Sequence, residues 1–143
     1  MNLTLPFRVA QLRLLLNATP LANVWDNASS SPIGDLWLSL HSADPGETGT
    51  QLTNEIAYTP YARVAVIRNT TGWVVSDVTG ICSPVVSIVY PILTVGSGTC
   101  THVGIGRDVT GAGYLFASGT ISPNIVISLG IAPELTTAST WAA

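Results

Sequence analysis

The sequence contains no lysine, and its five basic residues are arginines scattered along the chain. They are Arg8, Arg13, Arg63, Arg68 and Arg107. Only 9% of the residues are charged, against about 25% in ordinary soluble domains, and the net charge is −3. A protein that binds nucleic acid through its phosphates needs clustered lysine and arginine. We therefore expect no nucleic-acid partner.

Long apolar runs are also missing. No run approaches the roughly 20 residues that a helix needs to cross a bilayer, so we expect no membrane partner. The apolar patch at Leu12–Leu16 lacks the charged start and the small-residue cleavage site of a secretory signal. We therefore expect the protein to be cytosolic when it is synthesised.

Cysteine is scarce, with Cys82 and Cys100 alone. Both are expected to be reduced and buried, while a disulfide stays open as the alternative if their segments pair. A zinc site needs about four ligands, usually in two close pairs, and the nearby His102 does not complete one. Gly96–Gly98 and Gly111–Gly113 are expected at hairpins, because neither opens a helix as a nucleotide-binding loop does. We expect neither a metal nor a cofactor.

The residues that could carry catalysis do not assemble into a recognisable set. Ser39, His41, Ser42 and Asp44 are close in sequence, but a Ser-His-Asp triad is defined by geometry and a serine-rich chain offers such coincidences. There is no Gly-x-Ser-x-Gly elbow, and the acids are spread singly, so no carboxylate pair for glycoside cleavage can be proposed. We predict that the protein is not an enzyme. His41 is expected to end its strand with a hydrogen bond into the loop around Asp44.

From residue 33 onward, alternating apolar and polar residues indicate strands. Leu36, Leu38 and Leu40 show the two-residue period of a half-buried strand. Tyr61–Arg68 alternates in the same way, and Ser42–Pro60 is expected to be a long surface loop with an Asp-Pro-Gly turn. Further strands are expected at Trp73–Val75, Val85–Tyr90, Thr101–Ile105, Tyr114–Ala117, Ile125–Leu129 and Leu135–Trp141.

About eight short strands separated by glycine and proline predict an all-β fold. We expect residues 33–143 to form one antiparallel β-sandwich, jelly-roll-like in its connections, and large enough for a core. The turn at Asn69–Gly72 is expected to fold Trp73–Val75 back on the preceding strand as a hairpin.

Residues 1–32 differ from the rest and are expected to form an N-terminal arm that carries a short helix. Thr4 suits a helix cap, Pro6 suits the first turn, and Phe7–Leu16 contains neither glycine nor proline. Asn17–Pro20 is expected to end the helix. Either the arm docks on a neighbouring subunit or the helix packs on its own domain, and both alternatives stay open. The candidate docking residues are Phe7, Leu12, Leu15, Leu16 and Trp25, with the Trp25 ring as the expected anchor.

Arg63 is expected to clamp a loop to the sheet, because it lies in the middle of an apolar strand. A buried arginine must be paired, since an uncompensated buried charge costs roughly 3–5 kcal/mol. The candidate partners in the preceding loop are Asp44, Glu47 and Glu55. The alternatives are a salt bridge between subunits and an exposed side chain on a polar face. Arg68, at the strand end, is expected to be exposed and to contribute much less.

A surface so poor in charge predicts a homo-oligomer. Mixed charges sustain solubility, and large apolar patches are uncommon on monomers. The alternative is a neutral monomer whose surface is covered by serine and threonine.

The segment around Leu36–Arg68 also resembles a known family. The runs Leu40-His41-Ser42-Ala43-Asp44-Pro45-Gly46 and Tyr58-Thr59-Pro60-Tyr61-Ala62-Arg63, followed by Gly72-Trp73, resemble phage virion proteins. Members are often labelled tail fibre proteins, and relatives act as head decoration (cement) proteins. Family members usually have threonine at the position of Ser42 and glycine at that of Pro60. The resemblance continues through Thr101–Gly106, Gly111–Gly113 and Gly130–Pro133.

The resemblance implies a structural virion protein that decorates and stabilises the capsid shell. It implies a position on the capsid exterior, contact with the major capsid protein, and a homotrimer, because decoration proteins often occupy local three-fold axes. The alternative is a tail-fibre or tail-tip protein involved in host recognition, although the chain lacks a repetitive or coiled-coil shaft. A third class, an unrelated carbohydrate-binding sandwich, would need solvent-exposed aromatic side chains in a groove, and the four tryptophans are dispersed.

Overall fold

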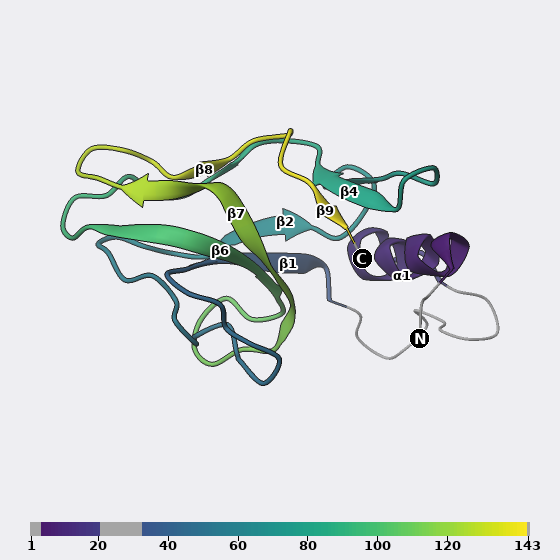
Figure 1. Cartoon of the computed structure of the whole chain (residues 1–143), viewed down its shortest axis with the longest axis horizontal. Helices are drawn as coiled ribbons and strands as arrows, with labels where there is room; N and C mark the ends of the chain where they lie inside the picture. Colours follow the sequence, from purple (N-terminus) through teal and green to yellow (C-terminus); the bar gives the residue numbers. More distant parts are fainter. Residues whose placement is uncertain (1–3, 21–32, 143) are drawn as a thin grey trace. The chain divides into compact units, whose positions relative to one another are not determined.

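The computed structural model describes residues 4–20 and 33–142, which form one helix and nine strands (Figure 1). In chain order these are α1 (Leu5–Asn17), β1 (Asp35–His41), β2 (Val64–Ile67), β3 (Trp73–Val75), β4 (Ile81–Pro84), β5 (Ile88–Val89), β6 (Gly98–Gly106), β7 (Leu115–Ile127), β8 (Glu134–Leu135) and β9 (Trp141–Ala142). They form sheets with the strand orders β2-β1-β6-β7, β3-β4-β9 and β5-β8. The predicted class, an all-β antiparallel sandwich with a short N-terminal helix, is confirmed.

The chain divides into two compact units. The helix unit comprises Met1–Asp35, Ile67–Ser87 and Leu135–Ala143, and the sheet unit comprises Leu36–Val66 and Ile88–Glu134. The division into an arm of residues 1–32 and a domain of residues 33–143 stays a prediction. In the part of the chain that the structure describes, no helix is long and apolar enough to cross a membrane.

Strand β1 forms the centre of the sheet unit. It pairs antiparallel with β6, and the register places Leu38 opposite Ile105 and Leu40 opposite Val103. The leucines of β1 are fully buried, as their spacing predicts, but Ser39 between them is fully buried too. The strand is therefore covered on both faces rather than half-buried, and its polar side chains need partners inside the protein.

Strand β7 joins two segments that the sequence pattern separates. The strands expected at 114–117 and 125–129 are one long strand, which pairs with β6. The pairing register shifts between Cys100 and His102, and Pro123 lies in the irregular stretch of β7 opposite this shift. A bulge removes the ladder hydrogen bond that proline cannot donate, so the strand continues past the proline.

In the helix unit, β3 pairs with β4, with Trp73 opposite Pro84 and Val75 opposite Cys82. The predicted hairpin between β3 and the preceding strand is wrong, because β2 belongs to a different sheet. The turn that decides the pairing is Ser76–Gly80, in which the Ser76 N–H donates to the Ile81 carbonyl at 2.9 Å. Gly80 has φ +69°, a conformation that favours glycine.

Helix α1 packs against β3 in the same unit. Val9 and Leu16 are buried, and the Asn17 side-chain amide donates to the Trp73 carbonyl at 3.1 Å. The helix ends where the sequence predicts, with Ala18 in the left-handed conformation. Thr4 occupies the predicted cap position, but its side chain makes no capping hydrogen bond.

Arg68, which belongs to the same unit as α1, holds the last turn of the helix. Its Nε donates to the Leu15 carbonyl at 2.6 Å, and its Nη2 donates to the Leu14 carbonyl. The expectation that Arg68 is exposed is wrong, since the residue is only 9% exposed. A cation near the carboxyl end of a helix meets the negative end of the helix dipole, which explains this choice of residue.

Candidate functional site

A buried ion pair between Arg63 and Glu55 is the centre of the sheet unit's loop region. The Arg63 Nε lies 2.7 Å from the Glu55 Oε1, and the Nη2 lies 2.7 Å from the Oε2, so the contact is bidentate. The two side chains are 2% and 7% exposed. The hydrogen bonds with Glu55 are the main reason that the pKa of Arg63 is raised. The pair fixes the end of the 42–60 loop close to the start of β2.

The same guanidinium also holds the turn between β6 and β7. Its Nη1 donates to the Asp108 carbonyl at 2.9 Å, and its Nη2 donates to the Gly111 carbonyl at 2.6 Å. The Tyr114 N–H, donated to the Asp108 carboxylate at 3.0 Å, lowers the pKa of that carboxyl and closes the turn. One arginine therefore joins the end of the loop and the start of β2 to a turn that lies 45–48 positions further along the chain.

Gln51 is a second link between the loop and the turn, and the sequence alone did not single it out. It is fully buried, its N–H donates to the Gly113 carbonyl at 3.0 Å, and its Oε1 accepts the Asp108 N–H at 2.9 Å. A Cβ at Gly106 would lie 2.0 Å from the Gln51 side chain, and one at Gly113 would lie 2.4 Å from it. Because only glycine leaves room for the Gln51 side chain at these two positions, Gly106 and Gly113 are the sequence features that point to this contact.

Of the three acids predicted to pair with Arg63, the structure brings Glu55 to it and places the other two at the outer part of the loop. The Asp44 Oδ1 accepts the Gly46 N–H at 2.9 Å, which stabilises the predicted Asp-Pro-Gly turn. Glu47 is exposed and lines an open cleft beside Asp44. The contacts of Arg63 are thus Glu55 and two backbone carbonyls.

Ser39 and His41 form a closed pair inside the sheet unit. The Ser39 hydroxyl and the His41 Nε2 are 2.8 Å apart, and the His41 Nδ1 lies 2.8 Å from the Thr53 carbonyl. Because a carbonyl accepts, Nδ1 carries the proton and the serine donates to Nε2. The predicted hydrogen bond from His41 into the loop thus goes to Thr53 rather than to the Asp44 turn. Both side chains have no exposed surface, and a Cβ at Gly104 would approach both within 2.7 Å.

Burial lowers the pKa of His41, and this has a consequence for stability. The unfolded chain takes up the proton near the ordinary value of 6.5, whereas folded His41 takes it up at a lower pH. The contribution to the free energy of unfolding is therefore complete above about pH 6.5 and is lost as the pH falls below that value. We expect the urea midpoint of the wild type to fall between pH 7 and pH 5 more steeply than that of His41→Gln. Parallel pH profiles for the two proteins would contradict this assignment.

Four of the five residues expected to dock the arm lie in α1, namely Phe7, Leu12, Leu15 and Leu16. Leu16 is 1% exposed, while Phe7, Leu12 and Leu15 are partly exposed. Trp25 lies outside the described residues. The helix packs on β3 of its own chain, which was one of the two alternatives. Contact of the partly exposed side chains with a neighbouring subunit stays a prediction.

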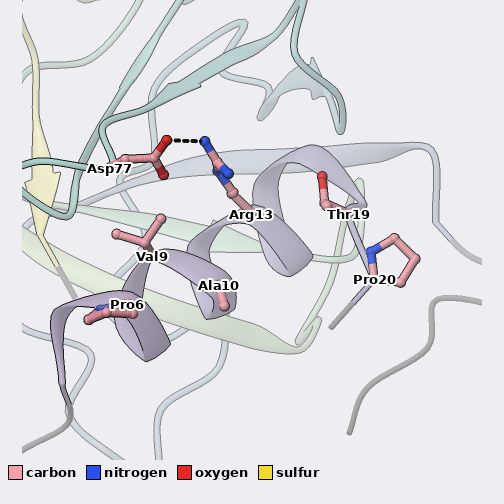
Figure 2. Close-up of a pocket in the computed structure, with 7 residues that line it drawn as sticks. All are labelled: Pro6, Val9, Ala10, Arg13, Thr19, Pro20 and Asp77. Carbon is pink, nitrogen blue, oxygen red and sulfur yellow. Dashed lines mark hydrogen bonds and ion pairs between the residues drawn. The ribbon is translucent and has the colours of Figure 1, made fainter. Parts of the chain in front are cut away.

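An open pocket of about 440 Å³ runs along α1 within the helix unit (Figure 2). It is lined by Pro6, Val9, Ala10, Arg13, Thr19, Pro20 and Asp77. The Arg13 Nη2 lies 2.6 Å from the Asp77 Oδ2 across its rim, and both side chains are largely exposed. An exposed pair of this kind contributes about 0–1 kcal/mol, so the pair marks the edge of the pocket rather than anchoring the helix.

The sheet unit presents an apolar surface that carries no charge. We define the apolar face as the exposed side chains of Val89, Ile92, Val95, Leu129 and Ile131, which are 52–72% exposed. Their segments are joined, because the Leu93 N–H donates to the Ile131 carbonyl at 3.2 Å and the Gly130 N–H donates to the Leu93 carbonyl at 2.9 Å. Neither 78–106 nor 109–133 contains a charged residue. An apolar face of this kind is typical of a surface that another subunit covers.

The cysteines and the possible metal ligands add no further site. Cys82 and Cys100 are free and buried, as expected, and burial raises their pKa values to about 11 and about 12. A thiol with such a raised pKa is protonated and unreactive at neutral pH. Within residues 4–20 and 33–142, no three His, Cys, Asp or Glu side chains converge as metal ligands.

Comparison with known families gives the class of the protein, which is a phage structural protein. The chain belongs to the family described as podophage GP4 fiber I protein gp80, whose model matches residues 15–137. No curated protein matches the chain.

The family membership supports the resemblance to phage virion proteins that the sequence shows. The expected phage virion family is confirmed at the level of a phage structural protein, and with it a location in the virion. The particular run of residues that carried the resemblance is not tested by this match.

Proposed function

We propose that the protein is a structural subunit of the fibre apparatus of a tailed phage. The observation that carries this proposal is the family match over residues 15–137, because the family is described by a fibre protein of a podophage. This favours the tail-fibre alternative of the sequence analysis over head decoration. Binding to the major capsid protein and a position on the capsid exterior belong to the head-decoration alternative.

The proposed role is structural rather than enzymatic. The support is that Ser39 and His41, the nearest approach to a catalytic pair, are closed inside the core with a backbone carbonyl as their third partner. A nucleophile must reach its substrate and an oxyanion-stabilising group, and this pair has no exposed surface. We propose that the protein works without a cofactor, a metal or a nucleic-acid partner.

The proposed partner is the protein itself. The support is the apolar face, whose charge-free surface is complemented best by another charge-free surface, and a second copy of the chain supplies one. We expect a closed assembly, since most homo-oligomers have closed symmetry, and three copies are the number that the resemblance to phage virion proteins implies. In a fibre apparatus this contact would join subunits to one another.

Phage particles that lack the protein test the proposed function. We expect particles made from a nonsense mutant of its gene to adsorb poorly to host cells and to retain their DNA on heating as the wild type does. Complementation from a plasmid should restore adsorption and serves as the control. Normal adsorption combined with early loss of DNA on heating would contradict the fibre role and support head decoration.

A further inference from the structure

The sheet unit contains an open cleft that shares no residue with the apolar face and has no role in the proposed contact between copies. It has a volume of about 300 Å³ and lies between the outer part of the 42–60 loop and the start of β7. It is lined by Asp44, Gly46, Glu47, Gly49, Leu115, Phe116, Ala117 and Ser118. A pocket with an aromatic wall and a few convergent polar groups is the usual form of a small-ligand site.

One aromatic ring of the cleft wall is exposed to solvent, and a second exposed ring packs against it. Phe116 lines it and is 36% exposed, and Tyr114 is 61% exposed. Their ring centroids are 5.3 Å apart at an angle of 58°. A pair of exposed rings offers negative ring faces to a ligand with slightly positive C–H groups, in addition to apolar area. A carbohydrate-binding sandwich needs exposed aromatic side chains in a groove, and here a phenylalanine rather than one of the four tryptophans lines the cleft.

The polar groups of the cleft are suited to hydroxyl groups. The carboxylates of Asp44 and Glu47 are exposed and can only accept hydrogen bonds, and Ser118 can donate or accept. Strand β7 is at the edge of its sheet in the described part of the chain, so its outward backbone groups add further donors and acceptors. Two carboxylates in the wall repel phosphate, sulfate and carboxylate groups. The ligand that matches a ring face together with these acceptors is an uncharged sugar.

The walls of the cleft are fixed before a ligand arrives. The Asn54 side-chain amide donates to the Asp44 carbonyl at 3.0 Å, and the Gly49 N–H donates to the Gly46 carbonyl at 3.1 Å. A Cβ at Gly49 would lie 2.2 Å from the Pro45 carbonyl oxygen, so the loop can close this tightly only with glycine there. A preorganised site loses less conformational entropy on binding than a flexible one.

We propose that this cleft binds a neutral hexose unit of a surface saccharide, with the sugar stacked on Phe116 and its hydroxyl groups hydrogen-bonded to Asp44 and Glu47. As a receptor contact the site rests on the proposed function, because a fibre protein meets the host surface. The binding itself is a property of the isolated protein and does not depend on its place in the virion.

The test is an NMR titration of the purified full-length protein with glucose, galactose, mannose and N-acetylglucosamine. We expect at least one of them to shift the amide signals of residues 44–49 and 114–118 with a millimolar dissociation constant. Phe116→Ala should weaken this binding by at least about tenfold, which corresponds to about 1.4 kcal/mol. Glu47→Gln, an exposed change that leaves the fold intact, should weaken it as well.

Val126→Ala is the matched control, because Val126 is an exposed apolar residue of the same strand outside the cleft. It should bind the sugar as the wild type does. The proposal is overturned if none of the four sugars shifts these signals at saturating concentration, if Phe116→Ala and Glu47→Gln bind as the wild type does, or if glucose 6-phosphate or a sulfated sugar binds more tightly than its neutral counterpart. Each of these results leaves the adsorption experiment on the virion unaffected, so the two proposals fail separately.

Discussion

Arg63→Ala should lower the free energy of unfolding by about 3–5 kcal/mol, because it leaves the carboxylate of Glu55 buried without its cation. Glu55 is 7% exposed, and its two oxygens accept the two short hydrogen bonds from Arg63. The variant also removes the donors of the Asp108 and Gly111 carbonyls in the turn between β6 and β7. Equilibrium urea unfolding, followed by tryptophan fluorescence, measures the change.

Arg107→Ala is the matched control for the Arg63 variant. Arg107 pairs with Asp108 at 3.2 Å, but its side chain is 53% exposed, and exposed pairs contribute about 0–1 kcal/mol. If Arg63 clamps the loop, the losses in free energy of unfolding of the two variants must differ by several kcal/mol, roughly 3–5 against 0–1. Similar small losses in both urea curves would show that the Arg63–Glu55 pair does not hold the loop.

A carboxylate placed in the apolar face should break the oligomer. We expect the wild type to be a trimer at micromolar concentration and Leu129→Asp to be a monomer, because burying an unpaired charge at a subunit contact is strongly unfavourable. Leu129 is 72% exposed, so the substitution fits the isolated chain without disturbing its core. The dissociation constant should rise by at least about a hundredfold, or about 2.7 kcal/mol. Size-exclusion chromatography with light scattering reads out the mass directly.

Val78→Asp is the control for this change. Val78 is 83% exposed, but it lies in the Ser76–Gly80 turn of the helix unit, outside the apolar face. Its variant should keep the mass of the wild type. A wild-type protein that stays monomeric, or a Leu129→Asp protein that stays trimeric, would show that the apolar face is not the contact between copies.

Local patterns in the sequence were sufficient to predict the class of fold and the position of the helix. The alternation of Leu36, Leu38 and Leu40 placed β1, and the proline near the start of α1 with the break after Asn17 placed the helix. These signals act over a few residues, so they can be read without knowing what packs against them. The burial of Arg63 follows in the same way from its position within an apolar run, but the expected strand is shorter than predicted and β2 begins only at Val64, after Arg63.

Contacts between distant segments could not be read in this way. The choice of Glu55 among the three acids depends on how the 42–60 loop folds back. The local Asp-Pro-Gly pattern identifies the turn at Asp44, but it does not show which acid reaches Arg63. The burial of Arg68 depends on α1, whose last turn it meets from more than fifty positions away in the chain. The cleft beside Phe116 joins a loop and a strand in the same manner. Such arrangements are set by tertiary packing rather than by local preference.

The pairing of β3 shows how a local signal can mislead. Asn69–Gly72 does form a turn, with the Gly72 N–H donating to the Asn69 carbonyl at 3.0 Å, but the strands on its two sides belong to different sheets. The turn at Ser76–Gly80 also has a glycine, and there the flanking strands do pair. A turn residue predicts a change of direction, whereas the partner of a strand is decided by the sheet as a whole.

Labelling of intact virions tests directly whether the protein is part of the fibre apparatus. An antibody against the purified protein, detected with gold particles by electron microscopy, reports where the protein lies in the particle. A nonsense-mutant particle that lacks the protein gives the background. The proposed function predicts gold at the fibres around the tail and none over the head shell. Gold spread evenly over the head shell, with none at the tail, would contradict it.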